Sequence, residues 1–187
     1  GDGAGVVQAV TADGGARAWR WTGATVDGVV AGGAVVAIVV GAEVIVVDAA
    51  TGLGLTRWRT SGGDRPRVAI ATRGVDTRVA ALEDGALVVR ARARAWQPVA
   101  ATAVDGTVAE LFAYGDRFAV ALADGSLYLV ADDGAAVAAG AVAAGWQPRG
   151  DRAVVVGATA TGDATVVGVD ARGIPRMTAT LVGARAA

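Results

Sequence analysis

Cysteine and histidine are both absent from this 187-residue chain. Their absence excludes disulfide bonds, thiolate nucleophiles, imidazole bases and the usual zinc and haem ligands. Without histidine, neither Ser61 nor Ser126 can belong to a Ser-His-Asp triad. We therefore predict no enzymatic activity, no catalytic residues, no cofactor and no metal site.

Lysine and asparagine are absent as well, so arginine carries the positive charge and the chain has no N-linked glycan acceptor. A composition dominated by Ala, Val, Gly and Arg is expected when coding DNA is very rich in G and C, as in a high-GC bacterium. The formal net charge of −1 gives no global basic field to attract nucleic acid or an anionic membrane. Partners must therefore be sought in local features.

Residues 28–42 carry no charge, yet they are too few to cross a membrane as a helix, and Glu43 and Asp48 follow closely. Glycines and β-branched valines in this stretch favour two strands separated by a turn at Gly32-Gly33. We predict no membrane insertion. With 53% hydrophobic residues, the chain can instead bury a core of its own.

Similar segments recur at intervals of about 40 residues, which is the period of propeller blades with four strands each. Equivalent positions in the recurring segments are Val7, Val44, Leu87, Leu127 and Val166. Asp-Gly pairs at residues 84–85 and 124–125 each separate two apolar runs, a strong hairpin signal. Frequent glycine and valine disfavour helices, and we predict that even the Ala-rich residues 135–144 form a strand because of their place in the repeat.

The repeat predicts an all-β chain, a β-propeller of four-stranded antiparallel blades that forms one partial domain over residues 1–187. The expected blades are residues 1–23 (two strands only), 24–62, 63–100, 101–144 and 145–187. About four and a half blades are thus visible, and we expect the ring to be incomplete. Because the last unit has its own fourth strand, at residues 176–182, and cannot complete the first, we expect further blades upstream in a parent chain, or another subunit, to cover the open edge. The start without Met or a signal peptide is expected of an excised or processed piece.

Residues 44–58 (VIVVDAATGLGLTRW) resemble the repeat of PQQ-like, quinoprotein-type β-propellers. In that repeat a third strand ends in Asp-Ala, a Thr-Gly turn follows, and a Trp lies on the fourth strand. Residues 10–21 are similar to a diverged copy that aligns Trp21 with Trp58, whereas Ala- and Thr-rich sequence replaces this Trp toward the C-terminus. The resemblance implies that Trp21 and Trp58 are structural and fill the wedge between neighbouring blades. Quinoprotein dehydrogenases hold PQQ and calcium with acidic and amide side chains and often a pair of adjacent cysteines. Since this sequence has neither Asn nor Cys, that cofactor site cannot be carried over to it.

Three arginines, Arg90, Arg92 and Arg94, alternate with alanine and are predicted to project from one face of a strand that reaches Trp96. Such a stripe suits an acidic partner or phosphate groups, and an ordinary solvated strand face is the alternative. Further arginines that are close enough in sequence to extend the stripe are Arg65, Arg67, Arg73 and Arg78.

Two other motifs remain open to interpretation. The tripeptide Trp-Gln-Pro occurs at residues 96–98 and 146–148, and its Trp is either an exposed contact for a partner or a packing residue. The acidic pair Asp132-Asp133, with Asp116 or Asp151, offers carboxylate oxygens, but the alternating pattern of a calcium loop is missing. Turn formation by these aspartates is the favoured interpretation.

These features predict a non-enzymatic β-propeller scaffold for protein–protein interaction or assembly, as a domain of a larger protein or complex. The alternatives are a glycan- or small-ligand-binding propeller and a fragment of a propeller enzyme. Expected partners are another protein or the remaining blades of a parent chain, and a homo-oligomer is a further option. Similar cofactor-free propellers include envelope assembly factors, which favours an extracytoplasmic location, with the cytoplasm as the alternative.

Overall fold

The computed structural model describes residues 5–10, 17–61, 65–114, 116–131, 134, 136–141, 146–149, 152–158, 164–169 and 175–181. These residues form eighteen strands and one short 3-10 turn. The chain divides into two compact units, Gly1–Ala101 and Thr102–Ala187, and the prediction of one partial propeller domain stays a prediction. No helix in the described part of the chain has the length and apolar character needed to span a membrane.

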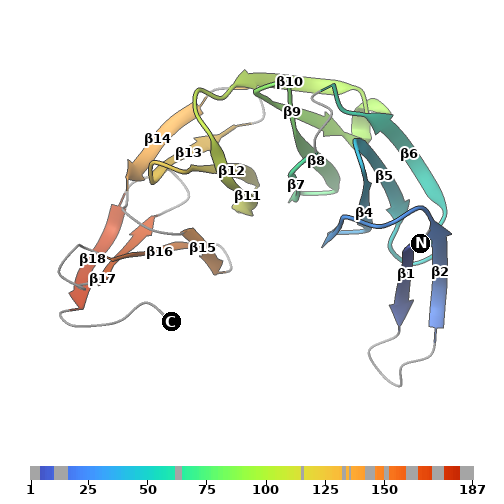
Figure 1. Cartoon of the computed structure of the whole chain (residues 1–187), viewed down its shortest axis with the longest axis horizontal. Helices are drawn as coiled ribbons and strands as arrows, with labels where there is room; N and C mark the ends of the chain where they lie inside the picture. Colours follow the sequence, from blue (N-terminus) through green and yellow to red (C-terminus); the bar gives the residue numbers. More distant parts are fainter. Residues whose placement is uncertain are drawn as a thin grey trace. The chain divides into compact units, whose positions relative to one another are not determined.

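The first unit holds a two-stranded sheet and two four-stranded sheets, the last strand of which extends two residues, Thr102 and Ala103, past the division at Ala101 (Figure 1). The two-stranded sheet pairs β1 (Gly5–Val10) with β2 (Arg17–Gly23). The second sheet has the order β3 (Gly28–Gly32), β4 (Val35–Val40), β5 (Glu43–Asp48) and β6 (Gly54–Arg59). The third sheet contains β7 (Val68–Arg73), β8 (Asp76–Glu83), β9 (Ala86–Ala91) and β10 (Pro98–Ala103), with the 3-10 turn η1 (Arg92–Arg94) between β9 and β10.

The second unit holds two more four-stranded sheets with the same order of neighbours (Figure 1). One contains β11 (Val108–Tyr114), β12 (Arg117–Leu122), β13 (Ser126–Val130) and β14 (Ala136–Ala141). The other contains β15 (Trp146–Arg149), β16 (Arg152–Ala158), β17 (Ala164–Val169) and β18 (Pro175–Leu181). In all four large sheets each strand pairs with the strand next to it in sequence, which is the simplest way to assemble a repeat of hairpins.

Tight turns containing Asp and Gly connect the strands where the sequence predicted them. Asp84 and Gly85, between β8 and β9, have φ angles of 46° and 73°, the pattern of a type I′ hairpin turn. In the second unit, Asp124 Oδ1 accepts a hydrogen bond of 2.8 Å from the backbone N–H of Ser126. These local turns fix the register of the flanking strands, as in the pairing of Leu82 with Leu87.

A shared core joins the two four-stranded sheets of the first unit. Valines and an alanine of β4 and β5 pack against β7 and β8 in one buried cluster, which contains Val35, Ala37, Val39, Val44, Val46, Val68, Ile70, Val79, Ala81 and Trp96. Gly32 allows the two sheets to approach, because a Cβ atom at this position would lie 2.8 Å from Ile70 Cγ2. The first unit is therefore held together by side chains from successive repeats.

The last strand of the third sheet differs from the prediction. We expected a short fourth strand that reaches Trp96, but the residues after β9 form η1 and the fourth strand is β10, from Pro98 to Ala103. The expected blade boundary between residues 100 and 101 thus falls inside β10. By contrast, the Ala-rich segment forms the strand β14 in spite of its helical propensity.

Candidate interaction site

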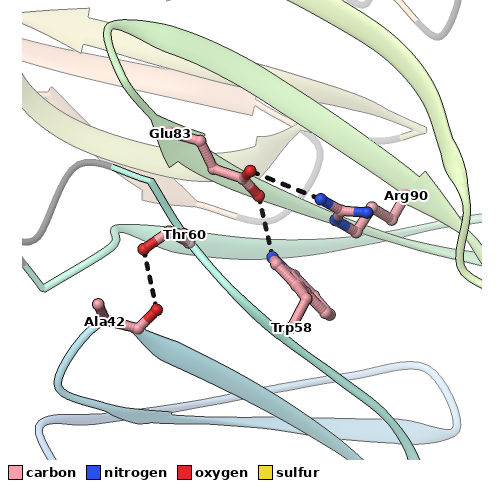
Figure 2. A network of polar contacts seen from close by, with 5 residues as sticks. All are labelled: Ala42, Trp58, Thr60, Glu83 and Arg90. Atoms are coloured by element: carbon pink, nitrogen blue, oxygen red, sulfur yellow. Dashed lines mark hydrogen bonds and ion pairs between the residues drawn. The ribbon is translucent and has the colours of Figure 1, made fainter.

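Arg90 belongs to a polar network that connects two sheets of the first unit (Figure 2). The indole N–H of Trp58, on β6, donates a hydrogen bond of 2.9 Å to Glu83 Oε1, at the end of β8. Arg90, on β9, places Nη2 3.5 Å from Glu83 Oε2 and its Cζ atom 4.9 Å from the centroid of the Trp58 ring. The side chains of Arg90 and Glu83 are only 16% and 10% exposed, so Arg90 is committed to internal contacts.

A second contact in Figure 2 holds the end of β6, the strand that carries Trp58. Thr60 is 4% exposed, and both its backbone N–H and its hydroxyl donate to the carbonyl oxygen of Ala42, at 2.8 and 3.0 Å. This contact attaches the end of β6 to the turn between β4 and β5. The end of β6 is therefore fixed close to Trp58, whose side chain contacts the neighbouring sheet.

The predicted arginine stripe is wrong in its geometry. Because β9 ends at Ala91, Arg92 and Arg94 lie in the 3-10 turn η1 and do not continue the strand face that carries Arg90. Both are exposed, while Arg90 is withdrawn between two sheets. The structure separates the three residues into one internal arginine and two surface arginines, and their role in partner binding stays a prediction.

Burial of Trp96 explains why the chain leaves the strand at this point. Ala95 and Trp96 adopt left-handed φ angles of 51° and 64°, and the backbone N–H of Trp96 donates to the carbonyl of Ala91 at 2.9 Å. The turn inserts the Trp96 side chain, 8% exposed, into the core cluster. Of the two interpretations of the Trp-Gln-Pro motif, packing is thus correct for Trp96, while the side chain of Trp146 lies outside the described part.

Two exposed arginines and two exposed apolar residues lie in the turns that follow β5, β7 and β9 of the first unit, and we call Leu53, Val75, Arg92 and Arg94 the loop-end cluster. Leu53 is 68% exposed and Val75 fully exposed. Val75 precedes Asp76, whose Oδ1 atom accepts a 2.9 Å hydrogen bond from the backbone N–H of Ala93, between the two arginines. Within the described part of the chain, the side chains of Arg92 and Arg94 make no hydrogen bond or ion pair.

Asp48 connects the cluster to the second sheet. Its carboxylate accepts hydrogen bonds from the backbone N–H and the hydroxyl of Thr51, both at 3.0 Å, and its backbone N–H donates to the carbonyl of Leu53 at 2.9 Å. The bonds from Thr51, aided by the positive charge of Arg92, hold the pKa of Asp48 below its ordinary value. Asp48 therefore lies close enough to Arg92 for the two charges to interact, while its carboxylate stays hydrogen-bonded within its own turn.

Trp21 and Trp19 lie at the boundary between the two-stranded sheet and the second sheet. Trp21 pairs with Val7, as Trp58 pairs with Val44, and it packs partly buried against a core cluster of both sheets. Trp19, which the sequence did not single out, is 8% exposed and donates from its indole N–H to the carbonyl of Ala49 at 2.7 Å. Trp19 and Trp21 are two residues apart on one strand and so share a face, a pattern from which the sequence could have predicted that Trp19 also packs.

A small pocket of about 120 Å³ lies within the second unit. Its lining comes from the end of β10, the loop that follows, and the sheet β11–β14, and comprises Thr102, Ala103, Val104, Asp105, Val120, Tyr128, Val130 and Ala136. Thr102 Oγ1 donates a 2.8 Å hydrogen bond to the carbonyl of Gly134, which fixes β10 to the turn before β14. The pocket was not predicted from the sequence.

Acidic side chains offer no metal site in the described ranges. No group of three or more His, Cys, Asp or Glu residues comes together there in a way that would hold a metal ion. Asp132, Asp133 and Asp151, which the sequence raised and favoured as turn residues, lie outside those ranges.

The four-stranded antiparallel sheets are those of β-propellers, and the chain matches solved structures of that class. BamB from Moraxella catarrhalis, a PQQ-like β-propeller, gives a TM-score of 0.59 at 16% identity, with 94% of this chain and 55% of that chain covered. The predicted resemblance to PQQ-like propellers is thereby confirmed at the level of the fold. No protein-family model matches the chain, and no curated protein matches it.

Two other propellers show the same likeness. The N-terminal domain of Nup159 gives a TM-score of 0.57 at 10% identity over 80% of this chain and 41% of that chain. A chain in the complex of KlAtg21 with the coiled coil of AgAtg16 gives 0.60 at 13% identity over 87% of this chain and 58% of that chain. At these identities the likeness shows the fold alone, and the chain spans only about half the length of the structures it matches.

Proposed function

We propose that this chain is a non-enzymatic propeller scaffold that binds an acidic segment of a partner protein through the loop-end cluster. The observation that carries the proposal is the pair of exposed arginines, Arg92 and Arg94, whose side chains make no hydrogen bond or ion pair with the described residues. An arginine that is free of internal partners retains all its N–H donors for a carboxylate. Rigid sheets that present short turns suit this task.

The apolar members of the cluster add an anchoring surface. Single exposed valines or leucines are ordinary on protein surfaces, but Val75 and Leu53 belong to the same group of turns as Arg92 and Arg94. Apolar contacts at the centre with charged contacts around them are the usual arrangement of a protein interface. A partner with acidic and apolar residues in alternation would complement this surface. KlAtg21, a structural neighbour, occurs in a complex with the coiled coil of AgAtg16, which supports a protein as the type of partner.

The alternative of a propeller that binds ligands with its tryptophans gains less support. Trp19 and Trp96 are buried, and Trp21 and Trp58 pack partly buried against core clusters. None of them lines the pocket of the second unit. The tryptophans that the structure describes with side chains thus serve packing.

A charge-matched pair of variants tests the proposal. Binding of synthetic peptides that alternate Glu with Leu would be measured by fluorescence anisotropy at low and at physiological salt. Replacing both arginines (R92Q/R94Q) should weaken binding by about tenfold or more, since each lost charge-assisted contact costs about 1 kcal/mol. The control R57Q/R59Q removes the same charge from exposed positions on β6 and should leave binding unchanged. Equal loss in the two variants, or no binding to the unaltered chain, would refute the loop-end cluster as the site.

A further inference from the structure

The pocket in the second unit occupies a position that is filled in the first unit. Trp58 is the fifth residue of β6, and Thr102 is the fifth residue of β10, the corresponding last strand. Likewise, Arg90 is the fifth residue of β9 and Val130 the fifth of β13, and each lies opposite a buried residue of the preceding strand. In the first unit the guanidinium of Arg90 lies over the indole of Trp58. At the corresponding positions the pocket has the smaller side chains of Thr102 and Val130, and a cavity is present between them.

The pocket has the size and the surface of a site for one aromatic ring. A closed cavity of about 150 Å³ lined by apolar side chains is known to accept benzene. This pocket measures about 120 Å³ and is partly open, so a phenol or indole ring would fill it and extend into solvent. Val120 and Val130 are buried at its floor, at 1% exposure each. Thr102, Val104 and Tyr128 are half-buried, and Ala103, Asp105 and Ala136 are exposed. Apolar floor and polar rim together are the usual composition of a small-ligand site.

The polar groups on the rim indicate what the ring should carry. The carboxylate of Asp105 makes no hydrogen bond or ion pair with described residues, so its acceptor capacity is free. In the first unit, the corresponding indole donates its N–H to a carboxylate, that of Glu83. We propose that the pocket binds a planar aromatic ring with one N–H or O–H donor, of the indole or phenol type, with the ring against Val120 and Val130 and the donor toward Asp105.

The same chemistry has two sources, a free small molecule or an aromatic side chain of another polypeptide. Calorimetric titration of the full chain with indole and p-cresol tests the first, and titration with a capped Leu-Trp-Leu peptide tests the second. Toluene, which has the ring without the donor, should bind at least tenfold more weakly than p-cresol. Binding of free indole but not of the peptide identifies a small-molecule site, while tight binding of the peptide identifies a side-chain socket.

Filling the pocket from within provides the decisive control. The variant T102W should abolish saturable binding of indole, because the added ring fills the pocket. It also removes the hydrogen bond from Thr102 Oγ1 to the Gly134 carbonyl, so a cooperative thermal transition is required to show that the variant folds. Its matched control A101W adds the same side chain at an exposed position of β10 and should retain wild-type binding. If T102W does not fold, T102L fills part of the space and should weaken indole at least tenfold.

The roles of Asp105 and of the pocket can be separated. D105N should weaken indole and p-cresol while leaving toluene unchanged, because only the donor contact is altered. Absence of saturable binding by indole and p-cresol in the unaltered chain would overturn the proposal, as would indole binding that persists undiminished in T102W. Neither outcome bears on the loop-end cluster, which lies in the first unit and has its own variants.

Discussion

The guanidinium of Arg90 lies over the ring of Trp58, with Cζ 4.9 Å from the ring centroid, and both side chains also contact the carboxylate of Glu83. The three residues come from two sheets, so their interaction stabilises the joint between successive repeats. Arg90 Nε is buried and makes no hydrogen bond among the described residues, which leaves the ring face to compensate for part of its desolvation.

Loss of the indole N–H at this joint should be measurable. We predict that W58F lowers the free energy of unfolding by about 1–3 kcal/mol, because the N–H donor to a charged acceptor is lost and the smaller ring offers less surface to Arg90. A double-mutant cycle of W58F with R90M should give a coupling energy of about 0.5–2 kcal/mol. Urea unfolding measures both quantities.

The neighbouring exposed ion pair is the control for this prediction. Arg57 Nε lies 3.9 Å from Glu43 Oε1, with the side chains 78% and 38% exposed. R57Q should therefore change stability by less than about 0.5 kcal/mol. A coupling near zero between Trp58 and Arg90 would show that their stacking contributes nothing beyond apolar burial.

Two glycines with the same backbone conformation should respond differently to alanine. Gly52 has φ of 72°, and a Cβ atom there would lie 2.7 Å from the ring of Trp19. Gly41 has φ of 56° and no atom within 4 Å of its added Cβ. G41A should cost about 1–2 kcal/mol for the left-handed conformation alone, and G52A about 1–3 kcal/mol more because Trp19 must move. Thermal unfolding of the two variants compares them, and equal losses would contradict a steric role for Trp19.

Much of the fold follows from the sequence because its determinants are local. Asp84-Gly85 specifies a two-residue hairpin on its own, and β7, β8 and β9 follow from alternating or apolar runs that the turn brackets. The period of about 40 residues then extends this assignment to the other repeats. Such signals do not depend on which residues meet across sheets.

The candidate sites depended on contacts that the sequence does not display. Arg90, Arg92 and Arg94 alternate like a strand, yet burial of Trp96 outweighs that local preference and ends β9 at Ala91. The sequence did not identify Thr102 as the counterpart of Trp58, because the fourth strand of that blade was expected to reach Trp96. Only the three-dimensional structure shows that a pocket is present at this place.

Asp48 should make stability depend on pH in the acid range. Hydrogen bonds from Thr51 lower the pKa of its carboxyl in the folded state below the ordinary value of 3.8. A lowered folded-state pKa stabilises the fold above the ordinary value, and this contribution is lost as the pH falls through the folded-state pKa. We predict that Tm of D48N falls less than that of the unaltered chain between about pH 4 and pH 2.

Thr51 provides the matched variants for Asp48. T51V removes the hydroxyl donor, so part of the acid dependence should disappear although the carboxylate is still present. T51S retains both the hydroxyl and the backbone N–H and should keep the full pH dependence. Identical acid profiles of T51V and T51S would show that the hydroxyl of Thr51 does not set the pKa of Asp48.

The burial of Trp96 holds the turn that exposes Arg92 and Arg94 of the loop-end cluster. Its insertion into the core holds Ala95 and Trp96 at left-handed φ angles, which cost about 1 kcal/mol or more for each side chain and persist only because surrounding contacts impose them. W96A should therefore destabilise the first unit by about 3–5 kcal/mol, through the cavity it leaves. It should also release the turn that separates Arg92 and Arg94 from Arg90.

The exposed neighbour Gln97 supplies the control, since Q97A should change stability by less than about 0.5 kcal/mol. Hydrogen exchange of the amides of Ala93 and Trp96, which donate to Asp76 Oδ1 and to the Ala91 carbonyl, reports the turn directly. If both amides keep their protection in W96A, the turn is formed by local backbone preferences and Trp96 merely occupies the core beneath it.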